Sequence, residues 1–329
     1  MAVLTDTAAV GTITVGVDVG GTKIQSAAVR AAKVVGGHRL MTPQTGAKDV
    51  ASAIADAVAK ALADAGVQTT DLEAVGMGVP GTIDSDGGTV ASSPNLPGFQ
   101  AAEPVPLGAT VSGALGGVPV KIDNDVRVAI LGEWKRGAGR DHRNLLGVWV
   151  GTGVGGGLVL DDELYEGQGA AGEIGHTIVK PGGRICSDGR RGHLEAYAGR
   201  ARMEVQARHL VKEGHKTELF EIMEKKGRTR LSSGVWAAAL EKHDKMAREL
   251  IDDAVWALGT GLASVQNLLA LEAIVVGGGL GDRLGQPFVN RIEKAMKPQL
   301  FVPDRPPRML TTEFGDLAGA VGAAVLAGG

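Results

Sequence analysis

The amino-acid sequence predicts an α/β protein of two lobes, each a mixed sheet flanked by helices, with a ligand-binding cleft between them. Two observations support this prediction. An apolar run, a glycine turn and a second apolar run follow one another at residues 13–29 and again at 145–160. Segments in which apolar residues recur at helical spacing stand between these strand-like runs. A chain of 329 residues is long enough for two such lobes.

The first predicted lobe, residues 1–137, ends in the polar turn KRGAGRDHRN. Its expected elements are, in order, a strand at 12–19, a second strand running to 29, a helix at about 50–65, strands at 74–79 and 118–122, and a helix at about 125–135. Such an alternation is typical of a sheet that is covered by helices.

The second predicted lobe, residues 138–329, repeats the opening pattern. Its expected elements are a strand at 145–150, a glycine turn at 151–157, a strand at 158–160, helices at about 194–212 and 233–269, a strand at 273–276 and a C-terminal helix from about 317. The C-terminal helix fits against either lobe, and packing back onto the first is one of the two arrangements we expect.

The composition limits which cellular compartment and which binding partners we expect. The formal net charge of −3 gives no electrostatic reason to expect nucleic acid or an anionic membrane as a partner. Cys186 is the only cysteine, so an intramolecular disulfide is excluded and a reducing compartment is favoured. No apolar run approaches the ~20 residues that span a bilayer, and the N-terminus lacks the pattern of a secretory signal. We therefore expect a cytoplasmic protein.

Glycine clusters follow three of the predicted strands. They are Gly20-Gly21-Thr22-Lys23, Gly151-Thr152-Gly153 with Gly155, and Gly277-Gly278-Gly279. Tight turns present consecutive backbone N–H groups that cradle phosphate, and threonine hydroxyls and a lysine add further donors. The first cluster does not match the P-loop pattern GxxxxGK[ST]. A single cluster is explained equally well by a hairpin, but three at strand ends predict a bound nucleotide.

Asp18 ends the strand before the first glycine cluster. It is either satisfied by local backbone donors or lies near Mg²⁺. We expect the second, because magnesium usually reaches a protein through one or two carboxylates plus substrate phosphates.

The segment Asp123-Asn124-Asp125 lies where a predicted strand gives way to a helix. An aspartate there is explained by N-capping alone. Transfer of a phosphoryl group to an alcohol, however, needs a base that accepts the hydroxyl proton, and Asp125 is our candidate for that base. Asn124, with a donor and an acceptor, is suited to a sugar hydroxyl.

Seven motifs together resemble the ROK family of bacterial sugar kinases and repressors, and within it most of all the ATP-dependent glucokinases. The motifs are DVGGTKIQ, GVPGTID, SPNLPGF, IDND, GTGVGGGL, AGEIGH and GDLAGAVGAA. They occur in order from about residue 13 to residue 326 and thus cover nearly the whole chain.

The resemblance implies the two-lobed actin-like, hexokinase-like ATPase fold and a specific reaction. ATP with Mg²⁺ would phosphorylate the 6-hydroxyl of a hexose, glucose first, with Asp125 as the general base. The sugar would be bound by Asp125 and by the residues at the family's sugar-binding positions: Gly81, Asn95, Asn124, Glu173, His176 and Glu195. Carboxylates, amides and an imidazole around a ring are what hexose hydroxyls require.

Alternatives remain open within and beyond this reaction. The hexose is also compatible with mannose, fructose, allose or N-acetylmannosamine, and polyphosphate is an alternative donor. The family's repressors carry a helix-turn-helix domain ahead of the kinase-like part, whereas only about a dozen residues precede the first predicted strand here. We therefore expect an enzyme of carbohydrate metabolism that works in glycolysis rather than a regulator. The resemblance also implies a homodimer or homotetramer.

The family's zinc motif is altered in this chain. Many members have a histidine and, beginning ten positions later, the motif CxCGxxGCxE, with the histidine and three cysteines as ligands. Here His176 is followed at that spacing by CSDGRRGHLE, so the ligand positions hold His176, Cys186, Asp188 and His193. Aspartate and histidine are themselves zinc ligands. We expect a retained structural zinc; loss of the metal, with ordinary packing in its place, is the alternative.

Two further expectations concern single side chains. Arg127, where the family commonly has asparagine, is expected to be a surface helix residue, with a position beside Asp125 as the alternative. The tryptophans at 134, 149, 236 and 256 fall on apolar patterns and are expected in the core.

Overall fold

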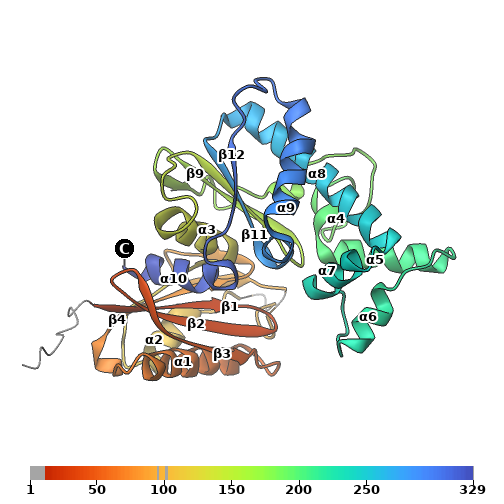
Figure 1. Cartoon of the computed structure of the whole chain (residues 1–329). Helices are drawn as coiled ribbons and strands as arrows, with labels where there is room; N and C mark the ends of the chain where they lie inside the picture. The colour runs from red at the N-terminus through yellow and green to blue at the C-terminus, as the bar shows by residue number, and fades with distance from the viewer. Residues whose placement is uncertain (1–11, 95, 101–102, 329) are drawn as a thin grey trace, which may run out of the picture. The chain divides into compact units, whose positions relative to one another are not determined.

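The structure, a computed structural model, describes residues 12–94, 96–100 and 103–328, and these form two compact units (Figure 1). Unit 1 contains the described residues up to Arg136 together with those from Leu317 onward. Unit 2 contains Gly137–Asp316. Each unit has a hydrophobic core of its own. The C-terminal helix therefore belongs to unit 1.

Unit 1 is built on a five-stranded sheet with the order β3-β2-β1-β4-β7. Strand β1 pairs antiparallel with β2 and parallel with β4, β2 pairs antiparallel with β3, and β4 pairs parallel with β7. The strands are β1 (Ile13–Val19), β2 (Lys23–Arg30), β3 (Lys33–Met41), β4 (Leu72–Val79) and β7 (Val120–Asn124), with β5 (Thr82–Asp84) and β6 (Thr89–Ser92) forming a separate hairpin. The helices are α1 (Ala47–Asp64), α2 (Leu107–Ala114), α3 (Asp125–Arg136) and α10 (Ala318–Gly328), with the short 3₁₀ helix η1 (Thr69–Asp71).

Helices cover both faces of this sheet (Figure 1). Helix α1 packs on β1, β2 and β3, while α10 packs on β1 and β4 from the face that also carries α3. A strand buried on both faces is apolar nearly throughout rather than alternating. This explains the sequences ITVGVDV in β1 and LEAVGMGV in β4.

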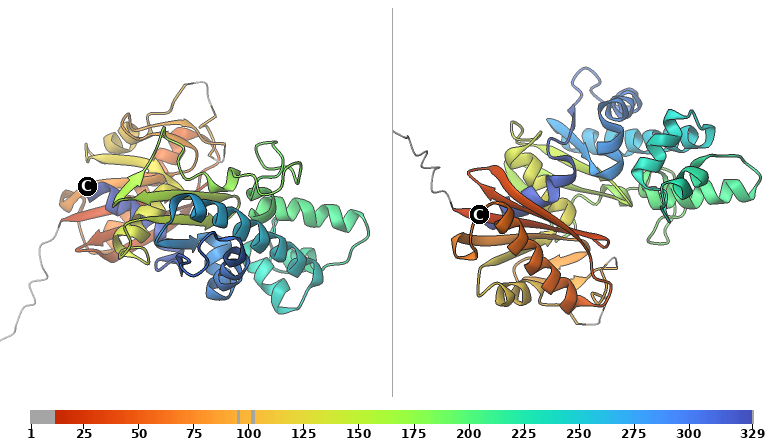
Figure 2. Two further views of the ribbon diagram at one scale, coloured as in Figure 1. Left: turned by 90° about the horizontal axis from the view of Figure 1, so that it is seen from above. Right: turned by 60° about the horizontal axis from the view of Figure 1, so that its bottom comes forward.

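Helix α10 lies directly on the strand backbones, and Figure 2 shows it in blue beside the red strands of unit 1. A Cβ on Gly16 in β1 or on Gly76 in β4 would lie 1.8 Å from a carbonyl oxygen of α10. A Cβ on Gly322 of α10 would likewise lie 1.8 Å from the carbonyl oxygen of Val128 in α3. The glycines of the motif GDLAGAVGAA and of the strands thus permit a close helix-to-sheet approach.

Unit 2 is built on a five-stranded sheet with the order β10-β9-β8-β11-β12. Its strands are β8 (Leu145–Val150), β9 (Val154–Leu160), β10 (Glu163–Tyr165), β11 (Ala273–Gly277) and β12 (Arg308–Thr311). Its helices are α4 (Glu195–Ala198), α5 (Arg200–Lys212), α6 (Leu219–Lys225), α7 (Ser233–Glu241), α8 (Lys245–Leu269) and α9 (Gly278–Met296), with the short 3₁₀ helices η2 (Ile174–His176) and η3 (Lys297–Gln299) and with η4 (Gly315–Leu317) leading into α10. Figure 2 shows α5–α7, in green and teal, grouped at one end of the unit.

The two sheets share one topology. Strands β8 and β9 pair antiparallel, as β1 and β2 do, and β11 pairs parallel with β8, as β4 does with β1. The edge strands β10 and β12 then take the places of β3 and β7. The prediction of two similarly built halves is therefore confirmed.

Two long helices that the sequence predicted are each broken. The segment 194–212 is divided between α4 and α5 at Gly199, whose extended backbone lies where a Cβ would be 2.9 Å from Glu195 Cγ. The segment 233–269 is divided between α7 and α8 because His243 adopts a positive φ of 61°. Asp244 then caps α8 by accepting a hydrogen bond from the Ala247 N–H at 2.8 Å.

Three details correct the sequence predictions in unit 2. The glycine turn is confined to residues 151–153, and Gly155 lies within β9, where it pairs with Trp149. Strand β11 ends at Gly277, and Gly278 and Gly279 belong to α9. Trp256 was expected in the core, but it is 40% exposed. Within the described part of the chain, no helix combines the length and apolar character needed to cross a bilayer.

Candidate functional site

In unit 1, the proposed base stands at the junction of β7 and α3. Asp125 is the first residue of α3, and its Oδ1 accepts a hydrogen bond from the Val126 N–H at 3.0 Å. Strand β4 runs close beneath it, because a Cβ on Gly78 would lie 3.2 Å from Asp125 Cα. A carboxylate at a helix N-terminus is stabilised as the anion, the form that accepts a proton.

Asn124 caps helix α3, a role that the sequence had offered as the alternative for Asp125. Its Oδ1 accepts hydrogen bonds from the backbone N–H groups of Val126 at 3.0 Å and Arg127 at 3.2 Å. Its Nδ2 donates to the Gly81 carbonyl at 3.2 Å. Two predicted sugar-binding residues, Gly81 and Asn124, are thus brought into contact. Asn95 lies outside the described residues.

Arg127 is buried, so its predicted position on the helix surface is wrong. It is 6% exposed and forms an ion pair with Asp123, which is 3% exposed. Asp123 Oδ1 also accepts hydrogen bonds from the Asn124 N–H at 2.6 Å and from the Ser85 hydroxyl at 3.1 Å. This network fixes the strand end that precedes Asp125.

The first glycine cluster forms the hairpin turn between β1 and β2. The Gly20 N–H donates to the Lys23 carbonyl at 2.8 Å, and a Cβ on Gly20 would lie 2.9 Å from that oxygen. Thr42 Oγ1 donates to the Gly20 carbonyl at 2.5 Å, and Gln44 Nε2 donates to the Gly21 carbonyl at 3.2 Å. Sequence analysis missed Thr42 and Gln44. Their signal is that they follow β3, which runs back alongside β2.

Asp18 lies against the first turn of α10. A Cβ on Gly319 would be 2.8 Å from Asp18 Cγ, so the helix can start there only because residue 319 is glycine. This placement brings a carboxylate to a helix N-terminus, which stabilises the helix electrostatically.

In unit 2, Glu195 holds the second glycine cluster. Its Oε2 accepts a hydrogen bond from the Val154 N–H at 3.0 Å, and a Cβ on Gly153 would lie 2.3 Å from the same oxygen. The start of α5 holds the other side of the turn, because the N–H groups of residues 200 and 201 donate to the carbonyls of Gly151 at 3.1 Å and Thr152 at 3.0 Å. Glu195 is 8% exposed.

The motif AGEIGH packs on the same turn. Gly175 in η2 lies against β9, since a Cβ there would be 2.0 Å from the Val154 carbonyl oxygen. The His176 N–H donates to the Glu173 carbonyl at 3.1 Å, which forms the tight turn between the two predicted sugar-binding side chains. The glycine of ExGH therefore positions Glu173 and His176 beside the 151–154 segment.

The third glycine cluster lies next to the second. Gly278, with a φ of 80°, lies where a Cβ would be 2.8 Å from the Val150 nitrogen, and Val150 directly precedes the turn at 151–153. A Cβ on Gly277 would be 3.2 Å from the ring of Trp149. Two of the three predicted phosphate-binding turns are thus adjacent within unit 2.

The four predicted metal ligands form one cluster. Their candidate ligand atoms, from His176, Cys186, Asp188 and His193, all lie within 4.8 Å of one another. Asp188 Oδ2 is 3.3 Å from Nδ1 of each histidine, the two Nδ1 atoms are 3.4 Å apart, and Cys186 Sγ is 4.0 Å from Nδ1 of His176. Zinc is held by such nitrogen, sulfur and carboxylate donors in a tetrahedral set of four, so the residues fit the ion.

The local environment lowers the pKa of one candidate ligand, Asp188, and raises the pKa of another, Cys186. The Arg190 N–H donates to Asp188 Oδ1 at 2.9 Å and lowers the pKa of that carboxyl. Burial raises the pKa of the Cys186 thiol, and the nearby Glu195 carboxylate raises it further. The thiol donates to Glu195 Oε1 at 3.3 Å. A metal ion must therefore displace the thiol proton to bind sulfur.

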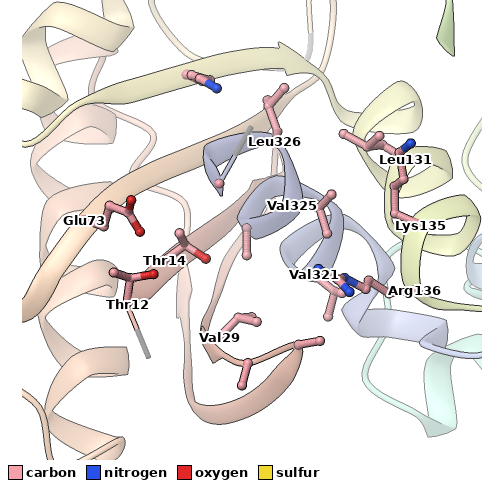
Figure 3. A pocket seen from close by; sticks show the side chains of 15 residues that line it. Thr12, Thr14, Val29, Glu73, Leu131, Lys135, Arg136, Val321, Val325 and Leu326 are labelled. Carbon is pink, nitrogen blue, oxygen red and sulfur yellow. The ribbon is translucent and has the colours of Figure 1, made fainter. Parts of the chain in front are cut away.

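Two pockets lie apart from the predicted site residues. In unit 1, a pocket of about 670 Å³ is lined by side chains of β1, the end of α3 and α10, with Lys135 and Arg136 at one end (Figure 3). In unit 2, a pocket of about 330 Å³ lies beside Trp256, whose ring meets that of Tyr197 edge to face at 5.5 Å.

Comparisons with known proteins agree on one family. The chain matches the model of the ROK family over residues 14–329. It is 34% identical to a glucokinase of Streptomyces coelicolor, with 96% of this chain and 97% of that protein covered. The crystal structure of a ROK family glucokinase from Streptomyces griseus in complex with glucose and AMPPNP superposes with a TM-score of 0.79, at 31% identity over 96% of this chain and 99% of that chain. An N-acetylmannosamine kinase of Haemophilus influenzae is 29% identical, with 93% of this chain and 92% of that protein covered. The chain belongs to the ROK family.

Proposed function

We propose that this protein is an ATP-dependent hexose kinase that transfers the γ-phosphate of ATP to the 6-hydroxyl of glucose. The observation that carries the proposal is the β7–α3 junction, where Asp125 begins a helix that Asn124 caps while contacting Gly81. These are the residues to which the family resemblance assigns the base and two sugar contacts. The similarity to glucokinases and to a glucose-bound family structure supports the same reaction.

Asp125 acts as the general base. Phosphoryl transfer to an alcohol requires a group that accepts the hydroxyl proton and directs the oxygen toward the γ-phosphate. The oxygen then forms the new bond to phosphorus as the bond to ADP breaks. Gly81, Asn95, Asn124, Glu173, His176 and Glu195 bind the sugar hydroxyls and present the 6-hydroxyl to Asp125.

The glycine turns bind the nucleotide. Gly20–Lys23 in unit 1 and Gly151–Gly153 with Gly277–Gly279 in unit 2 present backbone N–H groups, hydroxyls and a lysine to the phosphates. Gly155 contributes from the start of strand β9. Mg²⁺ neutralises the phosphate charge when bound, and Asp18 is the carboxylate that we assign to it.

The cluster of His176, Cys186, Asp188 and His193 holds a structural Zn²⁺. The ion would fix the loop between Cys186 and Glu195 and thereby orient His176 and Glu195, as residues around a metal commonly do. It takes no part in the transfer of the phosphoryl group.

A coupled assay of ADP release across a hexose panel tests the proposal. The panel contains glucose, mannose, fructose, allose and N-acetylmannosamine, the last because a relative is an N-acetylmannosamine kinase. We expect the highest kcat/KM with glucose. If N-acetylmannosamine or another sugar of the panel is turned over instead, the assigned substrate changes but the kinase activity stands. No turnover with any hexose would overturn the proposed function. A second series with polyphosphate in place of ATP tests the donor.

Asp125→Asn tests the base in the same assay. We expect kcat to fall by about 10²–10⁴, the usual contribution of a general base. Asp56→Asn is the matched control, since Asp56 lies on α1 in a surface pair with Lys60 at 2.8 Å. Full activity of Asp125→Asn would overturn the assignment.

We also propose that the enzyme acts in the cytoplasm as a homodimer or homotetramer, as the family resemblance implies and as a lone cysteine allows. Sedimentation equilibrium of the purified protein tests the assembly, and a monomeric mass at all concentrations would contradict it.

A further inference from the structure

Arg200 lies between the two adjacent glycine turns of unit 2. Its guanidinium Nη2 donates to Thr152 Oγ1 at 3.3 Å. The same Nη2 is 3.9 Å from the place that a Cβ on Gly279 would occupy. Its backbone N–H donates to the Gly151 carbonyl at 3.1 Å, so main chain and side chain of Arg200 both face these turns.

The guanidinium forms no close ion pair in the described part of the chain, and the Glu204 carboxylate attracts it only from a longer range. Glu204, one turn further along α5, is already engaged by Arg208 Nη2 at 2.6 Å and by the Leu231 N–H at 2.9 Å. Arg200 Nε is buried and makes no hydrogen bond to the described residues. A buried N–H without an acceptor costs free energy, and on a cation it costs more.

The surroundings add further positive potential. Arg200 is the first residue of α5, whose first turn contains no acidic residue. Helix α9 begins at Gly278, and Ser233, the first residue of α7, places its Oγ 3.7 Å from the Cβ position of Gly279. Helix N-termini carry partial positive charge, so an arginine there is unfavourable unless an anion joins it. Burial also lowers the pKa of Arg200, but an arginine remains charged at neutral pH.

We infer that Arg200 binds the phosphate chain of the nucleotide, between Thr152 and Gly279. The inference rests on the proposed use of ATP and adds a side chain that sequence analysis did not single out. A guanidinium presents a planar fork of donors that matches phosphate oxygens, and its unsatisfied Nε–H supplies one arm of that fork. Arg200 is thus a nucleotide-binding residue, and its bond to Thr152 holds it in place for that contact.

Calorimetric titration with ADP and with adenosine separates this role from a purely structural one. Adenosine lacks the phosphates, so a variant that has lost a phosphate contact should bind ADP more weakly but adenosine equally well. We expect Arg200→Gln to weaken ADP binding by about ten- to a hundredfold, as for a lost charge-assisted hydrogen bond, and to leave adenosine binding unchanged. Lys212→Gln is the matched control, because it removes a positive charge from an exposed position at the far end of the same helix. Its affinities for both ligands should match those of the wild type.

Two results would overturn the inference: unchanged ADP affinity in Arg200→Gln, or equal losses for ADP and adenosine. Either leaves the kinase proposal standing, whereas a wild-type protein that binds neither ligand contradicts the proposed function itself. Should Arg200→Gln fail to fold, Arg200→Lys carries the test. It keeps the charge but loses the fork, so ADP affinity should fall severalfold with adenosine unaffected, and an unaltered ADP affinity would refute the role.

Discussion

Glu195 accepts a hydrogen bond from the thiol of Cys186 at 3.3 Å. Its other oxygen accepts one from the backbone of Val154 at 3.0 Å. The side chain is buried, so both contacts are made in a poorly solvated environment. One buried carboxylate therefore contacts both the candidate metal cluster and the end of the glycine turn at 151–153.

Because Glu195 packs against this turn, substitution by alanine at two of its glycines should affect stability very differently. A Cβ on Gly153 would lie 2.3 Å from Glu195 Oε2. Among the described residues, a Cβ on Gly151 would meet only the Gly153 carbonyl at 3.9 Å, an ordinary contact. We expect Gly153→Ala to lower the free energy of unfolding by about 1–3 kcal/mol, the usual effect of overpacking. Gly151→Ala should not destabilise the protein. Urea unfolding of both variants measures this, and equal stabilities would show that Glu195 does not fill the space beside Gly153.

Loss of the metal should weaken the binding of the sugar more than the binding of ATP. We expect the purified protein to contain zinc and His193→Ala to lose it, since that change removes one of the four candidate ligands. With the loop loosened, the KM for glucose should rise while the KM for ATP changes little. Elemental analysis and steady-state kinetics measure both effects. The control is His209→Ala, an exposed histidine beside Glu213. A wild-type protein free of zinc after purification without chelators would refute the metal assignment.

Zinc affinity should increase with pH. In the proposed site zinc would bind the thiolate of Cys186, and burial raises the pKa of that thiol, so the ion would have to displace a proton at neutral pH. Raising the pH toward the pKa of the thiol reduces this cost, by up to about tenfold in affinity per pH unit. Competition with a chromophoric chelator at several pH values measures the slope. Cys186→Ala should bind zinc more weakly and with a flatter slope; an equal slope would show that the thiol is not a ligand.

The sequence predicted best where local chemistry decides the structure. The start of a helix at Asp125 follows from a polar segment after an apolar run, and the bounds of β8 follow from LLGVWV alone. The four candidate metal-ligand positions came from the resemblance to the family's zinc motif, and the structure brings all of them together.

Predictions were wrong where packing or distant partners decide. Gly199 interrupts a helical pattern because Glu195 occupies the space beside it. Arg127 was expected on the surface, since a charge on a helix is usually solvated, but Asp123 in the preceding strand neutralises it. Arg200 gave no signal, because its position depends on how the start of α5 folds against Gly151 and Thr152.

The buried pair of Asp123 and Arg127 should be costly to break. Arg127→Ala leaves the carboxylate of Asp123 buried without its cation, and removal of one partner of such a pair typically costs about 3–5 kcal/mol. The change should lower kcat as well, since Asp123 fixes the strand end before Asp125. Unfolding and kinetic measurements on Arg127→Ala, Asp123→Asn and the double variant form the test. The double variant should be more stable than Arg127→Ala, and strictly additive losses would exclude the pairing.

Substitution by alanine should have opposite effects on stability at two helical glycines of unit 1, Gly322 in α10 and Gly113 in α2. A Cβ on Gly322 would lie 1.8 Å from the Val128 carbonyl oxygen, a backbone atom that cannot move without shifting α3. We therefore expect Gly322→Ala to separate α10 from α3 and to reduce stability by about 3 kcal/mol or more. Gly113 in α2 is exposed, and a Cβ there would meet no atom of the described residues within 4 Å. Gly113→Ala should stabilise the protein by about 0.5–1 kcal/mol, because alanine has the higher helix propensity. Thermal unfolding of the two variants distinguishes the cases, and a stable Gly322→Ala would mean that α10 does not pack against α3 in solution.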